Sequence, residues 1–560
     1  MIIMSSYYYL LQTRQWWYKH NVVRTLSQYP FQSTTTPSLL LLQPLNYYST
    51  TSIHHDNSKS QPTKSFTKKK MNKFHDELNK FLSHPTSNNH NSSVSMDTCL
   101  KEYEFFASCL PGLESILEME FKQSNNNNNV CMIQKQKGGI SFRVSTMKDL
   151  YHCHYYFGCI SDILLRCSTF RARGYPELTR KVSSFSFWKN YFQLSTSTTK
   201  QKKKNIIYLD IRVSTYKSKL FHTKGIANAI CLGIQTSITK HHHSTTNNDD
   251  NSIPTFVLMQ NDNEEEDEKE VVKLLVRIIR DQVDISIYTL QTPLHRRGYR
   301  YETAKAPLRE DIAYALVYST IHHLSSSNNK TIIMMDPFCG SGTIAIEAVT
   351  IIKQLPPGRF QSSPFHHLSS KFYSSTLWNQ FVLEQQQQQQ QPCNNQVVIA
   401  TDINHGAIQA TINNAKRAGV LPYMNIYQSS FPSSLQQLVT KNNDDDDELL
   451  VVVTNPPFGK RITSLPKNNI PIKRRHTNGL LPLYQSIYNH SIQKHNIPIT
   501  ILSNDYQLIQ SSISGTDTTN KNVTQFTTQH GGIKVCAVTT TPDTTTTTTT
   551  TSDVTIQQDS

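Results

Sequence analysis

The amino-acid sequence predicts a two-part fold, in which an α+β N-terminal region precedes an α/β domain with a mostly parallel sheet. In residues 101–294, strand-like and helix-like segments follow each other without strict alternation, the order typical of α+β folds. From residue 304 to residue 540, apolar runs of strand length alternate with helical segments. Such alternation indicates βα units, whose parallel strands place a site at their carboxyl ends.

Long polar tracts dilute the chain. Only 37% of its 560 residues are hydrophobic, so the folded part is expected to be shorter than the chain. Tracts of Asn, Gln and Thr at 125–129, 385–391 and 544–551 cannot bury a core. We therefore expect low-complexity insertions, including a long one at 356–396, and a disordered Thr-rich tail at 541–560.

The charge balance favours a phosphate-rich partner. The net charge is +15, and acidic clusters at 262–270 and 444–448 conceal a still more basic remainder. Nucleic acid is the partner that such a surface suits, although solubility alone also explains the charge. The ten cysteines lack metal-ligand spacing, so no structural metal is expected. No apolar run reaches the ~18 residues of a membrane span.

Residues 1–56 have the composition of a targeting segment. No acidic residue precedes Asp56, while Arg14, Lys19 and Arg24 interrupt a stretch rich in Tyr, Leu and Ser. This composition predicts a transit peptide, most simply mitochondrial. A disordered leader on a cytoplasmic or nucleolar protein is the alternative. A polar linker is expected at 57–100.

The N-terminal region is predicted to contain both strands and helices. Its helices show apolar residues at helical spacing, as at positions 113, 116, 117 and 121. The predicted strands are 103–110, 138–144, 163–167, 206–213, 274–279 and 284–290, and the predicted helices are 113–121, 149–157 and one that starts at Ile226.

A short basic connector follows at 295–303. It carries His295, Arg296, Arg297 and Arg300 around a tyrosine. Cations beside an aromatic ring suit a nucleic-acid backbone, and we expect these four side chains to contact one. A solvated hinge is the alternative.

The α/β domain is predicted over residues 304–540. Gly419 follows one of its helices at a position suited to a C-cap. The predicted strands are 331–335, 397–400, 449–453, 499–502 and 530–538, and the predicted helices are 308–323, 344–353, 407–418 and 483–493.

A glycine-containing loop follows the first of these strands. It reads Asp336-Pro-Phe-Cys-Gly-Ser-Gly-Thr343, without the lysine of a phosphate loop or the glycine spacing of a dinucleotide loop. Because Gly340 and Gly342 lack Cβ, the backbone can approach a ligand closely. Asp336 can attract a cationic part of that ligand or hold the loop. The predicted cofactor-binding residues of this loop are Asp336, Pro337, Phe338, Cys339, Gly340, Gly342 and Thr343.

Asp402 ends the next predicted strand. A carboxylate there can accept hydrogen bonds from both hydroxyls of a ribose, as acidic residues do in dinucleotide folds. The insertion at 356–396 accounts for the long separation between Asp402 and the glycine loop. We therefore predict that Asp402 also binds the cofactor.

The segment Asn455-Pro456-Pro457-Phe458 ends another apolar strand. The amine of a base is a poor nucleophile because its lone pair is delocalised into the ring. The Asn455 side-chain oxygen and the Pro456 carbonyl can accept the two amine hydrogens and aim the lone pair at a methyl group. Pro456 and Pro457 stiffen the loop, and Phe458 can stack on an extruded base. The two loops together predict methyl transfer from S-adenosylmethionine to a planar nitrogen, with these four residues as the catalytic set.

These motifs resemble those of the THUMP-domain RNA methyltransferases. The resemblance is greatest to the bacterial-type guanine-N2 methyltransferases that act on large-subunit ribosomal RNA, and it covers roughly residues 103–537. The matching stretches are 106–114, 218–222, 295–300, 306–310, 336–343, 357–360, Asp402, Asn414-Ala415 with Gly419, and 455–461.

The resemblance implies a ferredoxin-like plus THUMP RNA-binding region at 101–294 and an α/β, Rossmann-like class I S-adenosylmethionine-dependent methyltransferase domain behind it. It implies transfer to the N2 amino group of guanine in structured RNA, with large-subunit ribosomal RNA as the expected partner. A monomer is assumed. The RNA-binding residues that we expect are Lys217, Lys219, His222, Lys224, His295, Arg296, Arg297, Arg300, Lys460 and Arg461.

The sequence departs from the family in one place. Where relatives carry an acidic residue that holds the adenine, this chain reads Tyr427-Gln-Ser-Ser430-Phe. Two outcomes are open: weaker cofactor binding, or Ser430 as the substitute acceptor. Three alternatives to ribosomal guanine remain open. They are transfer RNA guanine, an adenine or another planar amine, and a non-catalytic role in RNA binding or ribosome assembly.

Overall fold

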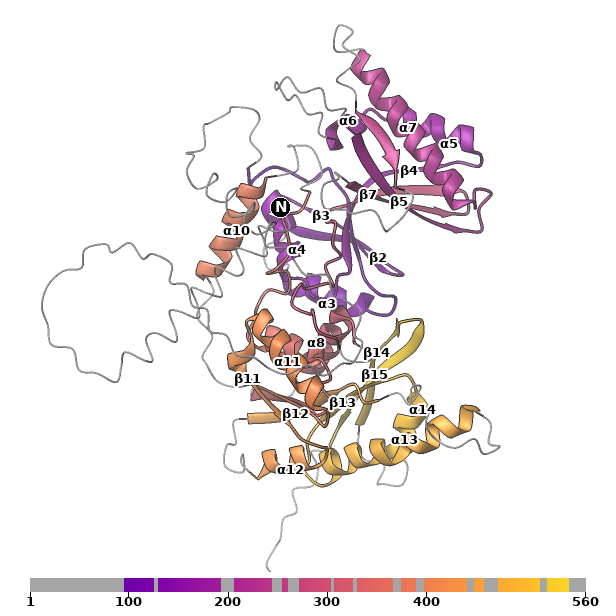
Figure 1. Cartoon of the computed structure of the whole chain (residues 1–560). Helices are drawn as coiled ribbons and strands as arrows, with labels where there is room; N and C mark the ends of the chain where they lie inside the picture. The colour runs from indigo at the N-terminus through magenta and orange to yellow at the C-terminus, as the bar shows by residue number, and fades with distance from the viewer. Residues whose placement is uncertain are drawn as a thin grey trace, which may run out of the picture. The chain divides into compact units, whose positions relative to one another are not determined.

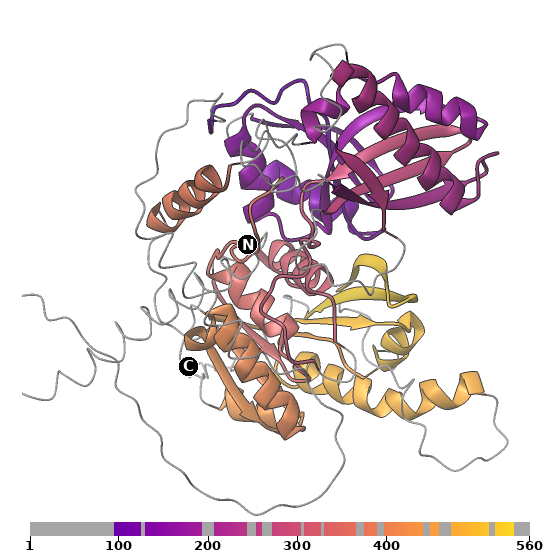
Figure 2. The same ribbon diagram turned by 45° about the horizontal axis from the view of Figure 1, so that its top comes forward.

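Two β-sheets, one in each predicted part, form the framework of the protein (Figures 1 and 2). The structure is a computed structural model that describes residues 95–124, 129–192, 206–243, 254–259, 271–303, 307–325, 330–365, 374–388, 397–440, 448–457, 472–513 and 521–542. Among the helices of these residues, none combines the length and the apolar character that a membrane span needs. The leader predicted at 1–56 lies outside the described residues.

The N-terminal region consists of eight strands and five helices over the described residues. They are β1 (Phe105–Ser108), α3 (Glu114–Ser124), β2 (Val130–Gln136), β3 (Gly139–Val144), α4 (Met147–Tyr156), β4 (Asp162–Arg171), α5 (Tyr175–Ser183), α6 (Trp188–Tyr191), β5 (Ile206–Tyr216), α7 (Thr223–His243), β6 (Thr255–Leu258), β7 (Val271–Ile279) and β8 (Gln282–Tyr288).

These strands form one mixed sheet in the order β2-β3-β1-β4-β8-β7-β5-β6. β1 pairs antiparallel with β3 and β4, whereas β5 pairs parallel with β6 and β7. Helix α3 packs on β2 and β3, and the pair α5 and α7 covers β5 and β6 (Figures 1 and 2). The α+β prediction for this region is confirmed.

Side-chain alternation explains why β1 holds the centre of that sheet. Phe105 and Ala107 are fully buried in the main core, while Phe106 points to the other face and packs with Leu164 and Tyr288. Successive residues of a strand face opposite sides, so both faces of this strand are used.

A capping box sets the start of α4 two residues before the predicted one. The Thr146 hydroxyl accepts the Asp149 N–H at 3.3 Å, and the Asp149 carboxylate accepts the Thr146 N–H at 2.8 Å. This reciprocal pair satisfies amide groups that the first turn of a helix leaves without partners. The helix therefore begins at Met147.

The C-terminal domain alternates strands with helices. Its elements are α8 (Glu310–Ser325), β9 (Thr331–Asp336), α9 (Thr343–Ile352), α10 (Ser375–Gln388), β10 (Val398–Asp402), α11 (His405–Ala418), η3 (Leu421–Tyr423), β11 (Met424–Gln428), α12 (Ser433–Val439), β12 (Glu448–Thr454), α13 (Ile472–Tyr488), η4 (Asn489–Gln493), β13 (Ile499–Ser503), α14 (Tyr506–Ile513), β14 (Lys521–His530) and β15 (Ile533–Thr541).

The sheet of this domain has the order β11-β10-β9-β12-β13-β15-β14. Its first five strands are parallel, and β15 and β14 add an antiparallel hairpin. The strand order reverses between β9 and β12, because β10 and β11 extend the sheet one way and β13 extends it the other. Ligands of open α/β sheets bind at such a switch point. The Rossmann-like prediction is confirmed.

Buried side chains cover both faces of this sheet. Along β9, Met334 belongs to the core that includes α8 and α9, while Ile333 and Met335 belong to the core with Tyr484 of α13 and Leu508 of α14. A sheet with helices on both faces explains why its strands read as continuous apolar runs.

Two predictions of local structure need correction. The strand predicted at 530–538 corresponds to β15 but begins at Ile533, because Gly531 and Gly532 take positive φ values of 56° and 77° and form the turn from β14, a strand that was not predicted. The Gln tract was expected to be disordered, yet its first residues continue α10 to Gln388. Glutamine is a good helix former, so it can extend an existing helix.

Candidate active site

The glycine loop lies between β9 and α9. Gly340 has φ 56° and Gly342 has φ 83°, a backbone region that residues with a Cβ avoid. A Cβ on Gly342 would also lie 2.7 Å from Cγ2 of Thr411 on α11. Glycine is therefore required at position 342 for both its conformation and its size.

Asp402 holds the glycine loop from the end of β10. Its Oδ2 accepts the N–H of Gly340 at 3.0 Å, and its Oδ1 accepts the N–H of Asn404 at 2.8 Å. The backbone of the same strand adds a bond from the Cys339 N–H to the Thr401 carbonyl at 3.0 Å. The structure thus brings the two predicted cofactor segments together. Each carboxylate oxygen keeps acceptor capacity for a further donor.

Asp336 connects the glycine loop to the end of β12. It is 1% exposed, and its Oδ1 accepts the Thr454 hydroxyl at 2.7 Å and the Phe338 N–H at 3.2 Å. Burial raises the pKa of this carboxyl to about 7, against the effect of the two hydrogen bonds. Of the two roles predicted for Asp336, these contacts support the one of holding the loop.

Asn455 follows β12 directly beside β9. Its side-chain Oδ1 is buried and has no hydrogen-bond partner among the described residues. Pro456 is buried and Pro457 is exposed. A buried acceptor without a partner costs about 1–3 kcal/mol, so the position suits an acceptor that meets its donor only when a ligand is bound. Phe458, Lys460 and Arg461 lie outside the described residues.

Two residues of α11, Thr411 and Asn414, also hold the loop, and the motif analysis assigned neither a role there. Thr411 Oγ1 donates to the Gly340 carbonyl at 3.0 Å, and Asn414 Nδ2 donates to the Ser341 carbonyl at 2.9 Å. Both side chains are fully buried. Polar residues on the inner face of an amphipathic helix are the signal that could have found them.

Two apolar residues at the rim, Ile403 and Phe431, were missed, whereas Phe338 and Ser430 belong to the predicted cofactor-binding set. Ile403, the residue after Asp402, is 72% exposed. The rings of Phe338 and Phe431 lie 5.9 Å apart at the ends of β9 and β11. Ser430 is exposed, and its carbonyl accepts the Ser434 N–H at 3.1 Å. An apolar residue next to a strand-end aspartate is a sequence signal for a surface that packs on a ring.

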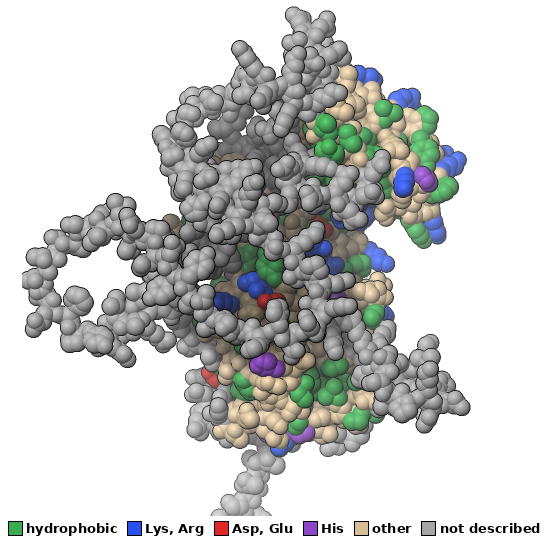
Figure 3. Space-filling view, in the orientation of Figure 1, with side chains coloured by type: hydrophobic (Ala, Val, Ile, Leu, Met, Phe, Trp, Pro, Cys, Tyr) green, Lys and Arg blue, Asp and Glu red, His purple; other side chains and the backbone are tan. Residues whose placement is uncertain are grey.

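The predicted RNA-binding residues after β5 are exposed. Lys217, Lys219, His222 and Lys224 all lie on the surface. Figure 3 shows Lys and Arg side chains in blue along the right-hand margin of the part that carries α5, α7 and β5.

Two aromatic residues of the same segment were missed. Tyr216 is 56% exposed, with the Lys217 ammonium 5.3 Å from its ring centroid, and Phe221 is 74% exposed. Asp281 fixes the backbone here, because its Oδ1 accepts the Lys219 N–H at 2.8 Å. Exposed rings between cations are suited to unpaired bases.

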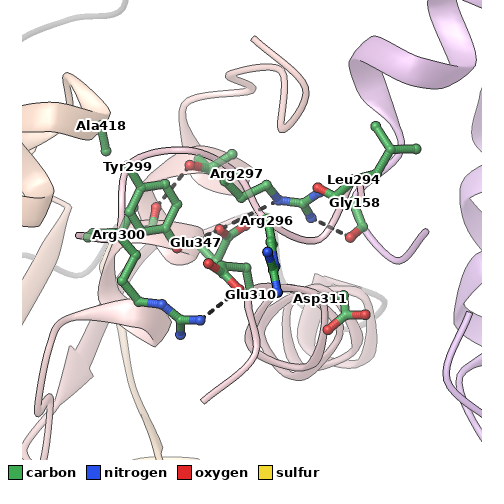
Figure 4. Close-up of polar contacts among 12 residues, drawn as sticks. Gly158, Leu294, Arg296, Arg297, Tyr299, Arg300, Glu310, Asp311, Glu347 and Ala418 are labelled. Atoms are coloured by element: carbon green, nitrogen blue, oxygen red, sulfur yellow. Dashed lines mark hydrogen bonds and ion pairs between the residues drawn. The ribbon is translucent and has the colours of Figure 1, made fainter. Parts of the chain in front are cut away.

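The connector does not present its four predicted cations to a partner. Arg297 is 2% exposed and faces Glu347, which is 1% exposed, at 3.8 Å (Figure 4). Arg297 also donates to the carbonyls of Leu294 and Gly158. A guanidinium enclosed in this way cannot reach a phosphate, so the predicted RNA contact of Arg297 is wrong.

The other three connector residues differ in exposure. The Arg300 side chain is 16% exposed and pairs with Glu310 at 3.2 Å. Burial lowers the pKa of His295 to about 4, which leaves the imidazole neutral at pH 7. Arg296 is exposed. Within the connector, Arg296 is therefore the cation that remains available to an RNA.

A family model matches part of the chain. Residues 297–473 match the model described as UPF0020, an RMKL-like methyltransferase domain. The match includes the glycine loop, Asp402 and Asn455.

Curated relatives match about a third of the chain. The chain is 33% identical over 192 residues to "Putative RNA methyltransferase YpsC" of Bacillus subtilis, which covers 34% of this chain and 45% of the relative. It is 29% identical over 191 residues to the ribosomal RNA large subunit methyltransferase K/L of a Psychrobacter strain, which covers 32% of this chain and 23% of the relative. The chain thus spans less than half the length of these relatives.

Solved structures match over both sheets. The crystal structure of "SMU.472, a putative methyltransferase complexed with SAH" aligns with a TM-score of 0.58 at 20% identity and covers 79% of this chain and 98% of that chain. A "possible methylase" from Clostridium difficile 630 aligns with a TM-score of 0.56 at 21% identity, with the same coverage. The two-part fold is therefore shared with these two proteins.

Proposed function

We propose that the chain, whose residues 297–473 match the model of an RMKL-like methyltransferase domain, is an S-adenosylmethionine-dependent RNA methyltransferase that modifies the N2 amino group of guanine in large-subunit ribosomal RNA. The observation that supports this reaction most directly is the buried Oδ1 of Asn455, which has no hydrogen-bond partner among the described residues and lies at the end of the strand next to β9.

The residues around the glycine loop fit a nucleoside-containing cofactor. S-adenosylmethionine, when bound, supplies an electrophilic methyl group. Asp402 has acceptor capacity for ribose hydroxyls, and the backbone at Gly340 and Gly342 has no side chain that would keep a ligand away. Ile403 offers an exposed apolar surface to the adenine ring. Ser430 is exposed at the same edge and can accept a hydrogen bond there.

The end of β12 fits an amine substrate. Asn455 Oδ1 and the Pro456 carbonyl would accept the two hydrogens of a planar amino group, which leaves its lone pair free to attack. Accepting both hydrogens also selects against ring nitrogens that carry one. Positioning of this kind supplies a large part of the rate in displacement reactions.

Exposed cations and the relatives support RNA as the substrate. Lys217, Lys219, His222 and Lys224 form a solvent-facing basic segment with two exposed rings. The Psychrobacter relative is a ribosomal RNA large subunit methyltransferase, and the Bacillus subtilis relative is described as an RNA methyltransferase. Transfer RNA guanine and an adenine amine are the alternative targets that the same acceptor geometry would serve.

Nucleoside mass spectrometry tests the proposal. RNA from cells without the protein should lose N2-methylguanosine in one RNA pool, and purified protein should restore it when S-adenosylmethionine is added. The variant Asn455→Ala should not restore it. Appearance of N6-methyladenosine instead would overturn the guanine assignment, and loss of the mark from transfer RNA alone would overturn the ribosomal one.

A mitochondrial location is part of the proposal and is supported by composition alone. Residues 1–56 fused to a fluorescent protein should direct it to mitochondria. A diffuse signal from that fusion, or nucleolar enrichment of the full-length protein, would contradict this location.

A further inference from the structure

A cavity of about 350 Å³ opens at the carboxyl end of β13, apart from the glycine loop. Its walls come from the segment after β13, the first residue of α14 and the β14–β15 hairpin. Pockets for small ligands measure about 300–1,000 Å³, so this volume suits one nucleotide-sized ligand. The lining includes Asn504, Tyr506, Thr524, Thr527, Lys534 and Cys536.

The strand order puts this cavity on the far side of Asn455 from the cofactor residues. Glycine loop and Asp402 follow β9 and β10, Asn455 follows β12, and the cavity begins where β13 ends. β12 and β13 are parallel neighbours with Thr454 opposite Ile501, and neighbouring strands lie about 4.8 Å apart. The cavity therefore begins one strand beyond Asn455, on the side away from the cofactor residues, and extends toward β15 and β14.

The lining has the chemistry of a nucleotide site. Tyr506 is 41% exposed and offers a ring face, and its hydroxyl accepts a hydrogen bond from Gln510 Nε2 at 3.0 Å, which holds it to α14. Lys534 is an exposed cation on β15. An aromatic ring for a base and a cation for a phosphate are the two elements of single-strand recognition, and the Asn504 amide and Thr524 hydroxyl add donors and acceptors.

The N-terminal region supports one wall of the cavity. A Cβ on Gly112 would lie 1.8 Å from the carbonyl oxygen of Thr527, so the turn at Gly112 packs directly on β14. Gly112 has φ 101°, which other residues rarely adopt. On the opposite side, Cys536 Sγ donates to the Ser503 carbonyl at 3.5 Å and connects β15 to β13. These contacts fix the backbone of two walls of the cavity, which is open to solvent.

We propose that this cavity binds the RNA nucleotide next to the methylated one, with its base on the Tyr506 ring and its phosphate at Lys534. This rests on the proposed RNA methyltransferase function. The target base must leave its stack to reach Asn455. If the adjacent nucleotide is bound in the cavity, the RNA strand stays unstacked at the target base. The expected substrate is then an unpaired or loop segment of RNA, and duplex RNA should not be methylated.

Steady-state methylation of the RNA that the wild type modifies provides the first test. Tyr506→Ala should raise the KM for RNA by roughly 5- to 150-fold, the range of one lost stacking contact, with little change in S-adenosylmethionine affinity. Tyr506→Phe keeps the ring and should behave as the wild type does. Equal KM values for Tyr506→Ala and wild type would overturn the proposal while leaving the methyltransferase function intact.

Binding of a fluorescent RNA decamer, followed by anisotropy, gives a second test that needs no reaction. Lys534→Ala should weaken binding and lower the salt slope of log affinity by about 0.7, the contribution of one phosphate contact on a single strand. Lys494→Ala removes an exposed cation before the opposite end of β13 and is the matched control. Equal salt slopes for both variants, or equal affinity for the decamer and its duplex, would contradict the proposal. If the wild type methylates no RNA, while Lys534→Ala but not Lys494→Ala lowers the salt slope of log affinity, the cavity binds RNA and the proposed methyltransferase function is wrong.

Discussion

Asn455 carries the proposed chemistry at the scale of single residues, and its state could not be predicted from sequence. The motif indicates which atoms can accept hydrogen bonds. Only the structure shows that the Oδ1 atom is buried without a partner among the described residues. The Oδ1 atom of an exposed asparagine would be hydrogen-bonded to water, and the same motif would then not orient a substrate amine.

Asn455→Ala should cut turnover by about 100-fold, or on the order of 3 kcal/mol of barrier. The reason is that the amine would lose an acceptor that orients its lone pair, while the glycine loop keeps its contacts. Calorimetry should show nearly unchanged affinity for S-adenosylmethionine. Full activity in this variant would mean that another group orients the amine.

Asp402→Ala should weaken S-adenosylmethionine binding by at least about tenfold, because one residue both accepts ribose hydroxyls and holds Gly340 through a 3.0 Å hydrogen bond. Asn404→Ala is the matched control. Its side chain accepts the Ala407 N–H at 3.1 Å as the N-cap of α11, so it should cost about 1 kcal/mol of stability. Equal affinities in the two variants would remove Asp402 from the cofactor site.

Asp336 should make stability depend on pH. Burial raises its pKa from an ordinary 3.8 to about 7. Between these values the folded state holds a proton that the unfolded chain has released, so the stability that Asp336 contributes falls as pH rises from about 4 to 7.

The variant Asp336→Asn keeps an oxygen that can accept both hydrogen bonds but cannot ionise. Relative to it, the wild type should lose roughly 3–4 kcal/mol of unfolding free energy across that window. Urea titrations at pH 5, 6, 7 and 8 measure the difference. A difference that stays constant with pH would show that Asp336 titrates at its ordinary value.

At the scale of elements, the sequence predicted the strands with continuous apolar runs and missed those without them. β9, β10, β12 and β13 are buried on both faces, and their apolar runs stand out. β2 is the edge strand of its sheet, pairs with β3 alone and is mostly exposed. Its sequence VCMIQKQ therefore shows no alternation of apolar and polar residues. The short helix α5 escaped as well, because nine residues show too little periodicity.

Gly342 and Thr411 should behave as a coupled pair between the glycine loop and α11. Gly342→Ala should weaken both stability and S-adenosylmethionine binding, because φ 83° disfavours a Cβ and that Cβ would lie 2.7 Å from Thr411 Cγ2. Thr411→Ser deletes that methyl group and retains the hydroxyl that bonds the Gly340 carbonyl at 3.0 Å.

The double variant should therefore be more stable than the sum of the two single changes predicts. Unfolding free energies of the four proteins form the required cycle. Strict additivity would mean that the backbone conformation at Gly342, and not its contact with Thr411, sets the requirement for glycine.

At the scale of the whole molecule, the connector shows why charge patterns alone misassign function. Arg296 and Arg297 are neighbours in a basic run, and the sequence gives no reason to separate them. Glu347, 50 positions further along the chain, is the partner that makes one of them structural. In the basic segment at 217–224, the buried Asp281 carboxylate accepts only the backbone N–H of Lys219. The four basic side chains are exposed, so the segment stays an RNA-binding prediction.

Arg297 should therefore matter to the joining of the two parts and not to RNA binding. It contacts Glu347 in the methyltransferase domain and the carbonyl of Gly158 in the N-terminal region (Figure 4). Arg297→Ala would leave the buried Glu347 without its cationic partner and with the Tyr299 hydroxyl as a remaining hydrogen-bond donor, a loss of about 3–5 kcal/mol of stability. Arg296→Ala changes an exposed side chain and should stay within about 0.5 kcal/mol of wild type.

Chemical denaturation gives the stability of both variants, and hydrogen exchange at residues 158–161 reports whether the contact with the N-terminal region opens. The double variant Arg297→Ala/Glu347→Ala should regain part of the stability lost in Arg297→Ala, because it leaves no buried carboxylate without a cation. Arg296→Ala should weaken RNA binding more than Arg297→Ala does, because of these two arginines only Arg296 is exposed. If Arg297→Ala leaves stability and exchange unchanged but lowers the salt slope of RNA binding, Arg297 reaches a phosphate after all, and the enclosed ion pair does not describe the RNA-binding state.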